Sequence, residues 1–123
     1  MNAEFGKAGE EAAVRYLRLR GYRIMARNLR IGRDELDIVA KRWGVWVFAE
    51  VKTRSDTRYG QPGEAVNTTK QRNVCRAAAA YLQRRRVTAP KIRFDVFEVV
   101  LSRGKLRLRH IPGAFEGNRY YQF

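Results

Sequence analysis

The sequence has few of the residues from which small proteins build disulfides or zinc sites: its 123 residues include one cysteine, Cys75, and one histidine, His110. One cysteine cannot form an internal disulfide, and its position within the apolar stretch 74–82 predicts a buried, unreactive thiol. Long apolar runs are absent and no basic-then-apolar segment opens the chain, so neither a membrane span nor a signal peptide is expected. These absences predict a soluble, cytoplasmic protein whose length fits one domain.

Acidic residues are also scarce, because 12 Asp and Glu stand against 26 Lys and Arg, which gives a net charge of +14. Such an excess predicts an anionic polymer as the partner. Of the basic residues 20 are arginine and 6 are lysine, and the guanidinium fork suits phosphate contacts, so nucleic acid is favoured over a membrane surface. An excess that serves only solubility is the simpler alternative, and composition leaves it open.

The apolar pattern near the start of the chain predicts a helix from Gly6 to Arg20, which Gly21 would end as a left-handed cap. Helical spacing places Glu10 on the face that carries the apolar residues and Glu11 on the solvent side. We therefore expect Glu10 to point inward.

Five short segments rich in β-branched and aromatic residues predict strands at 22–28, 34–41, 46–52, 92–101 and 105–111. The last segment alternates charged and apolar residues, as an exposed edge strand should. A second helix, capped at residue 67, 68 or 69, is expected to run to about residue 86. This order predicts an α/β (α+β) fold in which helices flank a mixed central sheet, within a core of about 5–111. Residues 112–123 are left unplaced.

The second and third predicted strands form a hairpin that carries the candidate chemistry. If they pair antiparallel around a loop at 42–45, the numbers of paired residues sum to 87 and Asp37 faces Glu50. Lys52 then lies opposite Glu35, and both carboxylates and the lysine share a face beside Val39, Phe48 and Trp46. The other face is wholly apolar and consists of Leu36, Ile38, Ala40, Val47, Ala49 and Val51.

Asp37 and Glu50 are the candidate metal ligands. Opposed side chains have Cβ atoms ~5 Å apart, and like charges there are destabilising unless a cation lies between them. Oxygen ligands without a nearby histidine or cysteine favour Mg²⁺ or Mn²⁺. Such a cation could activate water and neutralise a phosphate oxygen, while Lys52 could orient the water or contact the phosphate. Taken alone, the Glu-x-Lys motif is better explained by a solvated strand face on which Glu and Lys pair.

Three further observations favour the metal site. Glu10 could supply another carboxylate from the first helix. Lys70 lies on the core-facing stripe of the second helix, although a lysine that extends to solvent from the helix start is an equal explanation. The scarce acids also cluster in one part of the chain, at Asp34, Glu35, Asp37 and Glu50. Basic residues on either side could follow a nucleic-acid backbone or be merely solvated, namely Arg27, Arg30, Arg33, Arg54 and Arg58, with Tyr59.

An ordered set of motifs matches a known family: Gly9-Glu10, Arg27-Asn28, Glu35-Leu36-Asp37, Phe48-Ala49-Glu50-Val51-Lys52-Thr53-Arg54, Lys70 and Arg93-Phe94-Asp95. Over roughly residues 5–100 the chain resembles the YraN-like family of predicted endonucleases. That family is assigned to the restriction-endonuclease-like PD-(D/E)XK superfamily and is similar to archaeal Holliday-junction resolvases. The resemblance implies a mixed central sheet flanked by helices, in agreement with the pattern of elements.

The resemblance also implies roles for individual residues. Asp37 and Glu50 would bind the metal together with the Val51 carbonyl, Lys52 would be the catalytic lysine, and Glu10 would be the helix-borne acid. Gln61 and Lys70 would be secondary candidates. Asp34 stands where the family usually has glycine, and no proline precedes Asp37, but neither change removes a ligand.

The sequence leaves three functional classes open. The first is a metal-dependent endonuclease that cuts DNA, branched or junction DNA included, with a homodimer expected only if the resolvase analogy holds. The second is a non-catalytic basic nucleic-acid-binding module with the same fold. The third is a basic scaffold for a protein or RNA partner, suggested by the charge and by the aromatic tail of Tyr120, Tyr121 and Phe123.

Overall fold

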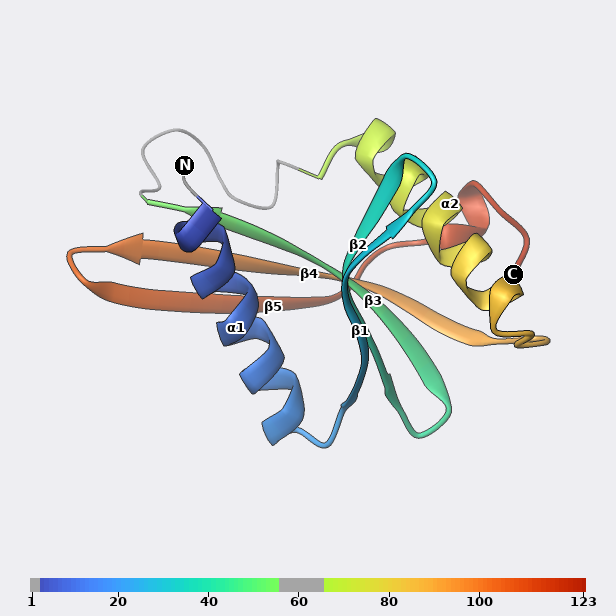
Figure 1. Ribbon diagram of the computed structural model, residues 1–123, viewed down its shortest axis with the longest axis horizontal. Helices are drawn as coiled ribbons and strands as arrows, with labels where there is room; N and C mark the ends of the chain where they lie inside the picture. The colour runs from blue at the N-terminus through green and yellow to red at the C-terminus, as the bar shows by residue number, and fades with distance from the viewer. Residues whose placement is uncertain (1–2, 56–65) are drawn as a thin grey trace.

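Two α-helices and five strands make up most of the protein in a computed structural model, which describes residues 3–55 and 66–123 (Figure 1). The elements are α1 (Ala3–Leu19), β1 (Arg23–Ile31), β2 (Asp34–Arg42), β3 (Val45–Arg54), α2 (Thr68–Arg84), β4 (Lys91–Ser102), β5 (Lys105–Phe115) and the short 3-10 helix η2 (Gly117–Arg119). The order of helices and strands is the predicted one. The main differences are that β1 and β5 extend three and four residues beyond their predicted ends, at 28 and 111.

The strands form one sheet in the order β1-β2-β3-β4-β5. Three neighbouring pairs are antiparallel, whereas β3 and β4 run parallel on either side of α2 in the chain. A parallel pair requires a long crossover, because the chain must return to the end of the sheet from which it started. The result is the predicted mixed sheet flanked by two helices, consistent with a restriction-endonuclease-like fold, and β5 lies at an edge as expected.

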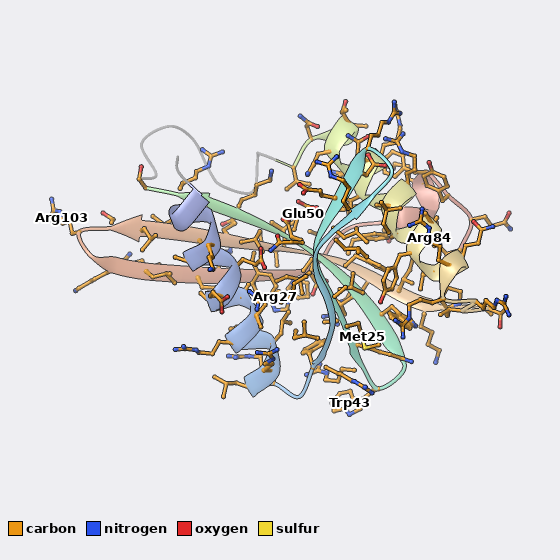
Figure 2. The ribbon with its side chains drawn as sticks, viewed as in Figure 1. Met25, Arg27, Trp43, Glu50, Arg84 and Arg103 are labelled. Atoms are coloured by element: carbon orange, nitrogen blue, oxygen red, sulfur yellow. The ribbon has the colours of Figure 1, made fainter. Side chains whose placement is uncertain are left out.

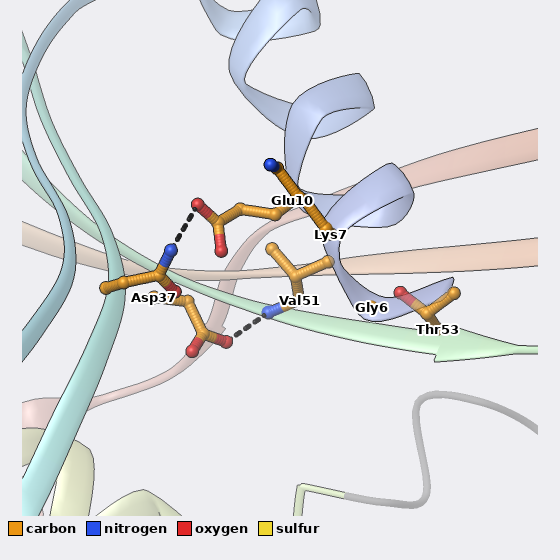
Figure 3. A pocket seen from close by; sticks show the side chains of 7 residues that line it. Gly6, Lys7, Glu10, Asp37, Val51 and Thr53 are labelled. Atoms are coloured by element: carbon orange, nitrogen blue, oxygen red, sulfur yellow. Dashed lines mark hydrogen bonds between the residues drawn. The ribbon is translucent and has the colours of Figure 1, made fainter. Parts of the chain in front are cut away.

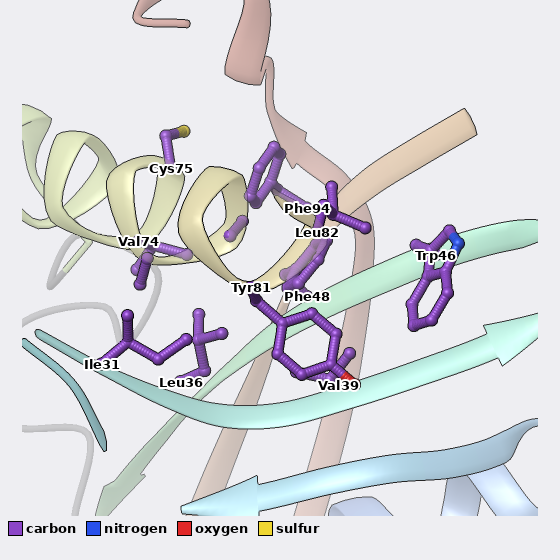
Figure 4. Close-up of a cluster of buried hydrophobic side chains, with 12 residues drawn as sticks. Ile31, Leu36, Val39, Trp46, Phe48, Val74, Cys75, Tyr81, Leu82 and Phe94 are labelled. Atoms are coloured by element: carbon purple, nitrogen blue, oxygen red, sulfur yellow. The ribbon is translucent and has the colours of Figure 1, made fainter. Parts of the chain in front are cut away.

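One helix covers each face of the sheet. The core under α1 includes Ala13, Val14, Leu17, Ile38, Ala40, Val47, Ala49 and Phe97. The core under α2 includes Leu36, Val39, Trp46, Phe48, Val74, Tyr81, Leu82 and Phe94 (Figure 4). The prediction that Leu36 shares a face with Ile38 is wrong, because the alternation of β2 is interrupted between them. Opposite this point Asn28 bends β1 with a φ of 48°.

The helix ends follow local rules. Gly21 has a φ of 85°, and the Tyr22 amide donates to the Leu17 carbonyl, which closes α1 with the predicted left-handed cap. Asn67 caps α2, since its side chain accepts a hydrogen bond from the Lys70 amide at 2.9 Å. Neither helix of the described ranges combines the length and the apolar character that a membrane crossing needs.

The C-terminal segment, which the sequence leaves unplaced, packs on the core under α2. β5 continues to Phe115, whose ring stacks on Phe94 with centroids 5.0 Å apart. The ring of Phe123 lies 5.9 Å from that of Phe94. Gly117 is buried against both Phe94 and Phe123, where an added methyl group would overlap the rings. The apolar residues of this segment follow neither helical nor strand spacing, because individual aromatic rings rather than a regular face hold it on the core. Periodicity therefore does not predict its position.

Gly9 lies where α1 meets β3, and a methyl group added there would overlap the side chain of Thr53. The Gly9→Ala variant is therefore expected to lose about 1–3 kcal/mol of unfolding free energy, because α1 must shift away from the sheet. Gly6→Ala is the matched control, since Gly6 has open space beside it in the same helix, and alanine there should add up to about 1 kcal/mol. Urea denaturation measures both changes, and equal effects would contradict the described approach of α1 to Thr53.

Candidate active site

The predicted register of β2 and β3 is confirmed for the pairs Ile38–Ala49, Val39–Phe48, Ala40–Val47, Lys41–Trp46 and Arg42–Val45. The loop is shorter than predicted, because only Trp43 and Gly44 turn the chain, both with positive φ. Turns of this kind match the twist of the strands that they join. The paired region ends one step before the predicted Asp37–Glu50 pair.

Beyond the last pair, the Asp37 side chain takes the place of a backbone partner for β3. Its Oδ2 accepts a hydrogen bond from the Val51 amide at 2.9 Å, which draws the carboxylate to the strand that carries Glu50. The predicted pairing of Glu35 with Lys52 is wrong: Glu35 pairs with β1, and Lys52 lies beside β4. The strands therefore part where the two acids meet.

Glu50 is a buried carboxylate with few partners. The residue is 2% exposed, its Oε2 lies 3.6 Å from Lys70 Nζ, and its Oε1 has no hydrogen-bond partner among the described residues. Burial, followed by the negative charge of Asp37, raises the pKa of Glu50 to about 8, while the charge of Lys70 acts in the opposite direction. Buried carboxyls with raised pKa values concentrate at functional sites, because the fold must hold them against a free-energy cost.

A pocket of about 300 Å³ opens beside Asp37 (Figure 3). Its lining comes from α1, β1, β2 and β3 and consists of Gly6, Lys7, Glu10, Asn28, Asp37, Val51 and Thr53. Glu50 is not among these residues, so Asp37 is the link between the pocket and the buried acid.

Glu10 points inward as predicted, and Glu11 points to solvent, with side chains 11% and 53% exposed. Glu10 Oε1 accepts hydrogen bonds from Arg27 Nε at 3.1 Å and from Asn28 Nδ2 at 2.9 Å. Arg27 also bonds to Glu11, so it ties α1 to β1. Glu10 thus shares the pocket with Asp37, but the described residues contain no group of three or more acidic, histidine or cysteine side chains placed to hold one metal ion.

Two lysines lie near the acids. Lys70, from the first turn of α2, pairs with Glu50 and so points into the site rather than out to solvent. Lys52 is half-buried, two residues after Glu50 on β3, and its positive charge favours the ionised form of Glu50 by lowering the pKa. The sequence left two positions for Lys70 open, in the cleft or extended to solvent, and the contact with Glu50 supports the first, although the Lys70 side chain keeps 35% exposure.

The arginines that were predicted to bind nucleic acid have different surroundings. Arg27 is held by the two acids of α1. Arg30 on β1 and Arg33 at the β1–β2 turn are exposed, and Arg54 is half-buried at the end of β3. Three residues of the prediction lie outside the described ranges, namely Arg58, Tyr59 and Gln61.

The acidic cluster divides into two parts. Asp34 is buried and forms a bidentate ion pair with Arg76 of α2, with N–O distances of 2.7 and 2.8 Å. The hydrogen bond from Arg76 holds the pKa of Asp34 below its usual value. Glu35 is exposed. Asp37 and Glu50 are therefore the two hairpin acids that the fold brings together, and Asp34 fastens α2 to the β1–β2 turn.

A buried ionic network joins β4 and β5, and residue spacing in the sequence does not predict it in full. Asp95, with no exposed surface, accepts hydrogen bonds from Arg93, His110 and the Gly113 amide at 2.7–3.0 Å. Arg93 also donates to the Tyr22 hydroxyl at 2.7 Å. The signal was present, because Arg93 and Asp95 are two residues apart in a strand and so share a face. Their partners come from parts of the chain that no spacing rule connects.

The chain was compared with known proteins. It matches the model of the "Uncharacterised protein family UPF0102" over residues 9–99. A UPF0102 protein of Symbiobacterium thermophilum is 50% identical over 116 residues, which are 94% of this chain and 98% of that protein. UPF0102 proteins of Bacteroides thetaiotaomicron and Syntrophomonas wolfei are 48% and 44% identical over 91% and 94% of this chain, and over 92% and 100% of their own lengths. The chain therefore belongs to the UPF0102 family, the YraN-like group that its motifs resemble.

Proposed function

We propose that the protein is a metal-dependent endonuclease that hydrolyses phosphodiester bonds in DNA. The observation that carries the proposal is the buried Glu50 carboxyl, which has an oxygen without a partner and lies beside a second acid, Asp37. A protein with a net charge of +14 attracts phosphates. Two adjacent acids at the centre of such a protein are unfavourable unless Glu50 keeps a proton, as its raised pKa indicates for the metal-free protein, or a cation lies between the two carboxylates.

The residues of the site fit a divalent cation. Glu50 Oε1 offers an unpartnered oxygen, Asp37 offers a carboxylate that the Val51 amide holds in place, and the Val51 carbonyl would complete the protein ligands. All three are hard oxygen ligands, which suit Mg²⁺ or Mn²⁺. When bound, such a cation supplies Lewis-acid stabilisation of a phosphate oxygen and lowers the pKa of a coordinated water.

The chain's own groups position the substrate and manage charge. Lys70 neutralises part of the charge of Glu50, and an ammonium at this place is a point charge that can contact a non-bridging phosphate oxygen. We assign Lys52 to the orientation of the attacking water or of the scissile phosphate. Glu10, fixed by Arg27 and Asn28, presents a carboxylate to the pocket that Asp37 also lines, where it can accept a proton from water.

The exposed Arg30 and Arg33 would bind the DNA backbone together with Arg54, and the predicted contacts of Arg58 and Gln61 remain part of the proposal although both lie outside the described residues. Branched or junction DNA is the substrate class that we propose, by analogy with the resolvases that the motifs resemble. A homodimer belongs to this proposal, since a junction presents two symmetric phosphates, and so does a cytoplasmic location.

A non-catalytic nucleic-acid-binding module is the second candidate, and one contact favours it. The Lys70 ammonium already lies 3.6 Å from Glu50 Oε2, where it provides the acid with a positive partner. In that case Glu50 and Lys70 would form an internal ion pair with a structural role and no metal would be needed. The two candidates differ in whether a divalent cation binds and whether DNA is cut.

The test is incubation of the protein with labelled duplex, single-stranded, flap and four-way-junction DNA in Mg²⁺ or Mn²⁺. Cleavage is expected to stop with EDTA and to fall at least about a hundredfold in Asp37→Asn and Glu50→Gln, because each removes a charged ligand. Lys52→Ala should fall by a similar factor. Glu35→Gln is the matched control, an exposed acid on the same strand as Asp37, and should cut at the wild-type rate.

Cleavage that survives in Asp37→Asn would exclude the site. Salt-sensitive DNA binding without cleavage of any of these substrates would support the binding module instead.

A further inference from the structure

The tip of the β2–β3 hairpin carries a residue that the fold does not require. Trp43 occupies the first central position of the two-residue turn, with a φ of 51°, and is followed by Gly44 with a φ of 79°. Turns with two positive φ values favour asparagine, aspartate or glycine, and a bulky side chain there is strained. Trp43 is 87% exposed, so burial of the ring does not offset this cost.

The ring of Trp43 is accompanied by a fixed positive charge. The Arg42 guanidinium carbon lies 4.4 Å from the Trp43 ring centroid and 4.1 Å from that of Tyr22. Arg42 Nη1 also donates to the Arg20 carbonyl at 2.8 Å, which fixes the guanidinium between the two rings. The guanidinium covers one face of the Trp43 ring, and the 87% exposure of Trp43 leaves the other face to solvent, an arrangement that suits a flat aromatic ligand bearing a negative charge.

The surroundings of Trp43 are basic. Neither segment 12–33, which holds the end of α1 and β1, nor segment 38–49, which holds the hairpin tip, contains an acidic residue. Arg23 pairs with Lys41 across β1 and β2, next to Arg42. A second copy of this chain docked on the tip would bring like charges together, and an uncharged peptide would leave them uncompensated. A nucleotide supplies both a ring and a phosphate.

We propose that Trp43 is a stacking platform for an unpaired nucleobase, with Arg42 at its side to contact the adjoining phosphate. This inference rests on nucleic acid being the ligand in the proposed function, and it adds that the ligand has a single-stranded segment. A paired base inside a duplex presents no free face to the tip of a hairpin, whereas every unpaired base can stack on an indole.

The position of the platform sets the geometry of the substrate. Trp43, in the turn after β2, follows Asp37 by six residues, which at about 3.3 Å per residue places it ~20 Å along the hairpin. Figure 2 shows Trp43 at the end of the hairpin, away from Glu50. A spacing of ~20 Å corresponds to about six stacked nucleotides. The unpaired base would thus lie several nucleotides from the proposed cleavage site.

The test is binding in EDTA to an oligo-dT strand and to a blunt duplex of the same length. The chain has two tryptophans, and the other, Trp46, is buried with 4% exposure. Oligo-dT is therefore expected to quench the Trp43 part of the emission, whereas the blunt duplex should quench little.

The Trp43→Asn variant should lose about tenfold in affinity for oligo-dT and keep its affinity for the duplex, because stacking is lost and charge is not. Asparagine suits the turn, so the variant should fold at least as well as the wild type. Trp43→Phe should recover part of the loss. Leu19→Asn, which removes another exposed apolar side chain, 77% exposed, is the matched control and should bind both strands as the wild type does.

Unchanged oligo-dT affinity in Trp43→Asn would overturn the platform, and so would equal losses for the two DNAs. These outcomes are separate from failure of the nuclease proposal. Loss of stacking leaves metal-dependent cleavage of DNA testable, and absence of cleavage leaves the metal-free binding assay intact.

Discussion

Replacing Glu50 with glutamine is expected to stabilise the metal-free protein at pH 7, by about 1–3 kcal/mol. The native carboxyl is 2% exposed, with a pKa of about 8 against an ordinary 4.5. At a pH between 4.5 and about 8, the Glu50 carboxyl is ionised in the unfolded chain but keeps its proton in the folded chain. The free energy of unfolding therefore falls as pH rises through this range. Glutamine does not titrate, and its own need for hydrogen bonds limits the gain.

The stability difference between Glu50→Gln and the wild type should depend on pH. Below pH 4.5 both states of the wild type are protonated and the cost of Glu50 vanishes, whereas above about pH 8 the cost is complete. The stability difference between Glu50→Gln and the wild type should therefore widen from pH 5 to pH 8. Thermal unfolding in EDTA at several pH values measures it, with Glu35→Gln as an exposed control.

Metal addition should reverse the order of stability. Mn²⁺ or Mg²⁺ would stabilise the folded wild type by mass action and should stabilise Glu50→Gln much less, since a ligand charge is missing. A stability difference that stays constant from pH 5 to pH 8 would contradict a protonated, buried Glu50. Equal stabilisation of both proteins by metal would contradict its role as a ligand.

Replacing Asp95 with asparagine should be among the most damaging single changes in the protein, costing roughly 3 kcal/mol of unfolding free energy. Burial alone would raise the pKa of Asp95, but hydrogen bonds from His110, Arg93 and the Gly113 amide outweigh it and lower the pKa. Its contribution to stability is therefore present above its ordinary pKa of 3.8 and is lost as the pH falls below that value. The variant leaves Arg93 without a counter-charge.

Glu98→Gln is the matched control for Asp95, because Glu98 is also buried on β4 but has a longer contact, 3.7 Å to the exposed Arg109. It should cost less than about 1 kcal/mol. The double variant Arg93→Met, Asp95→Leu should recover part of the loss, since removing both charges leaves neither unpaired. Equal losses in Asp95→Asn and Glu98→Gln, measured by urea denaturation, would show that the network adds no stability beyond ordinary burial.

The hairpin shows how far the sequence predicts the site. Alternation and turn chemistry are local, so the register that sends Val39 and Phe48 to one face could be read from residue spacing. The break at Asp37 could not, because it arises where Asn28 bends β1 and the Val51 amide turns to a side chain. Local rules predict continuous strands, whereas the site lies where a strand pair opens.

The charged residues show the same limit. The sequence identified Glu10 as inward-facing and placed Glu50 beside Asp37, because helical and strand periodicity sort side chains by face, but it left Lys70 open between the cleft and solvent. It counted Asp34 in the cluster of acids that favours a metal site, although Arg76 of α2, 42 residues away in the chain, holds it. Partners across that separation depend on how α2 crosses the sheet, which periodicity does not specify.

The open sheet has a further consequence for the behaviour of the protein at high concentration. In the part of the chain that the structure describes, β1 and β5 each have one neighbouring strand, and the other edge of such a strand is where another molecule's strand could add. Basic residues recur along both outer strands, at Arg23, Arg27, Arg30, Lys105, Arg107 and Arg109. Any edge-to-edge contact between two copies would set these cations against each other, so the positive charge that draws in phosphate also opposes the growth of aggregates.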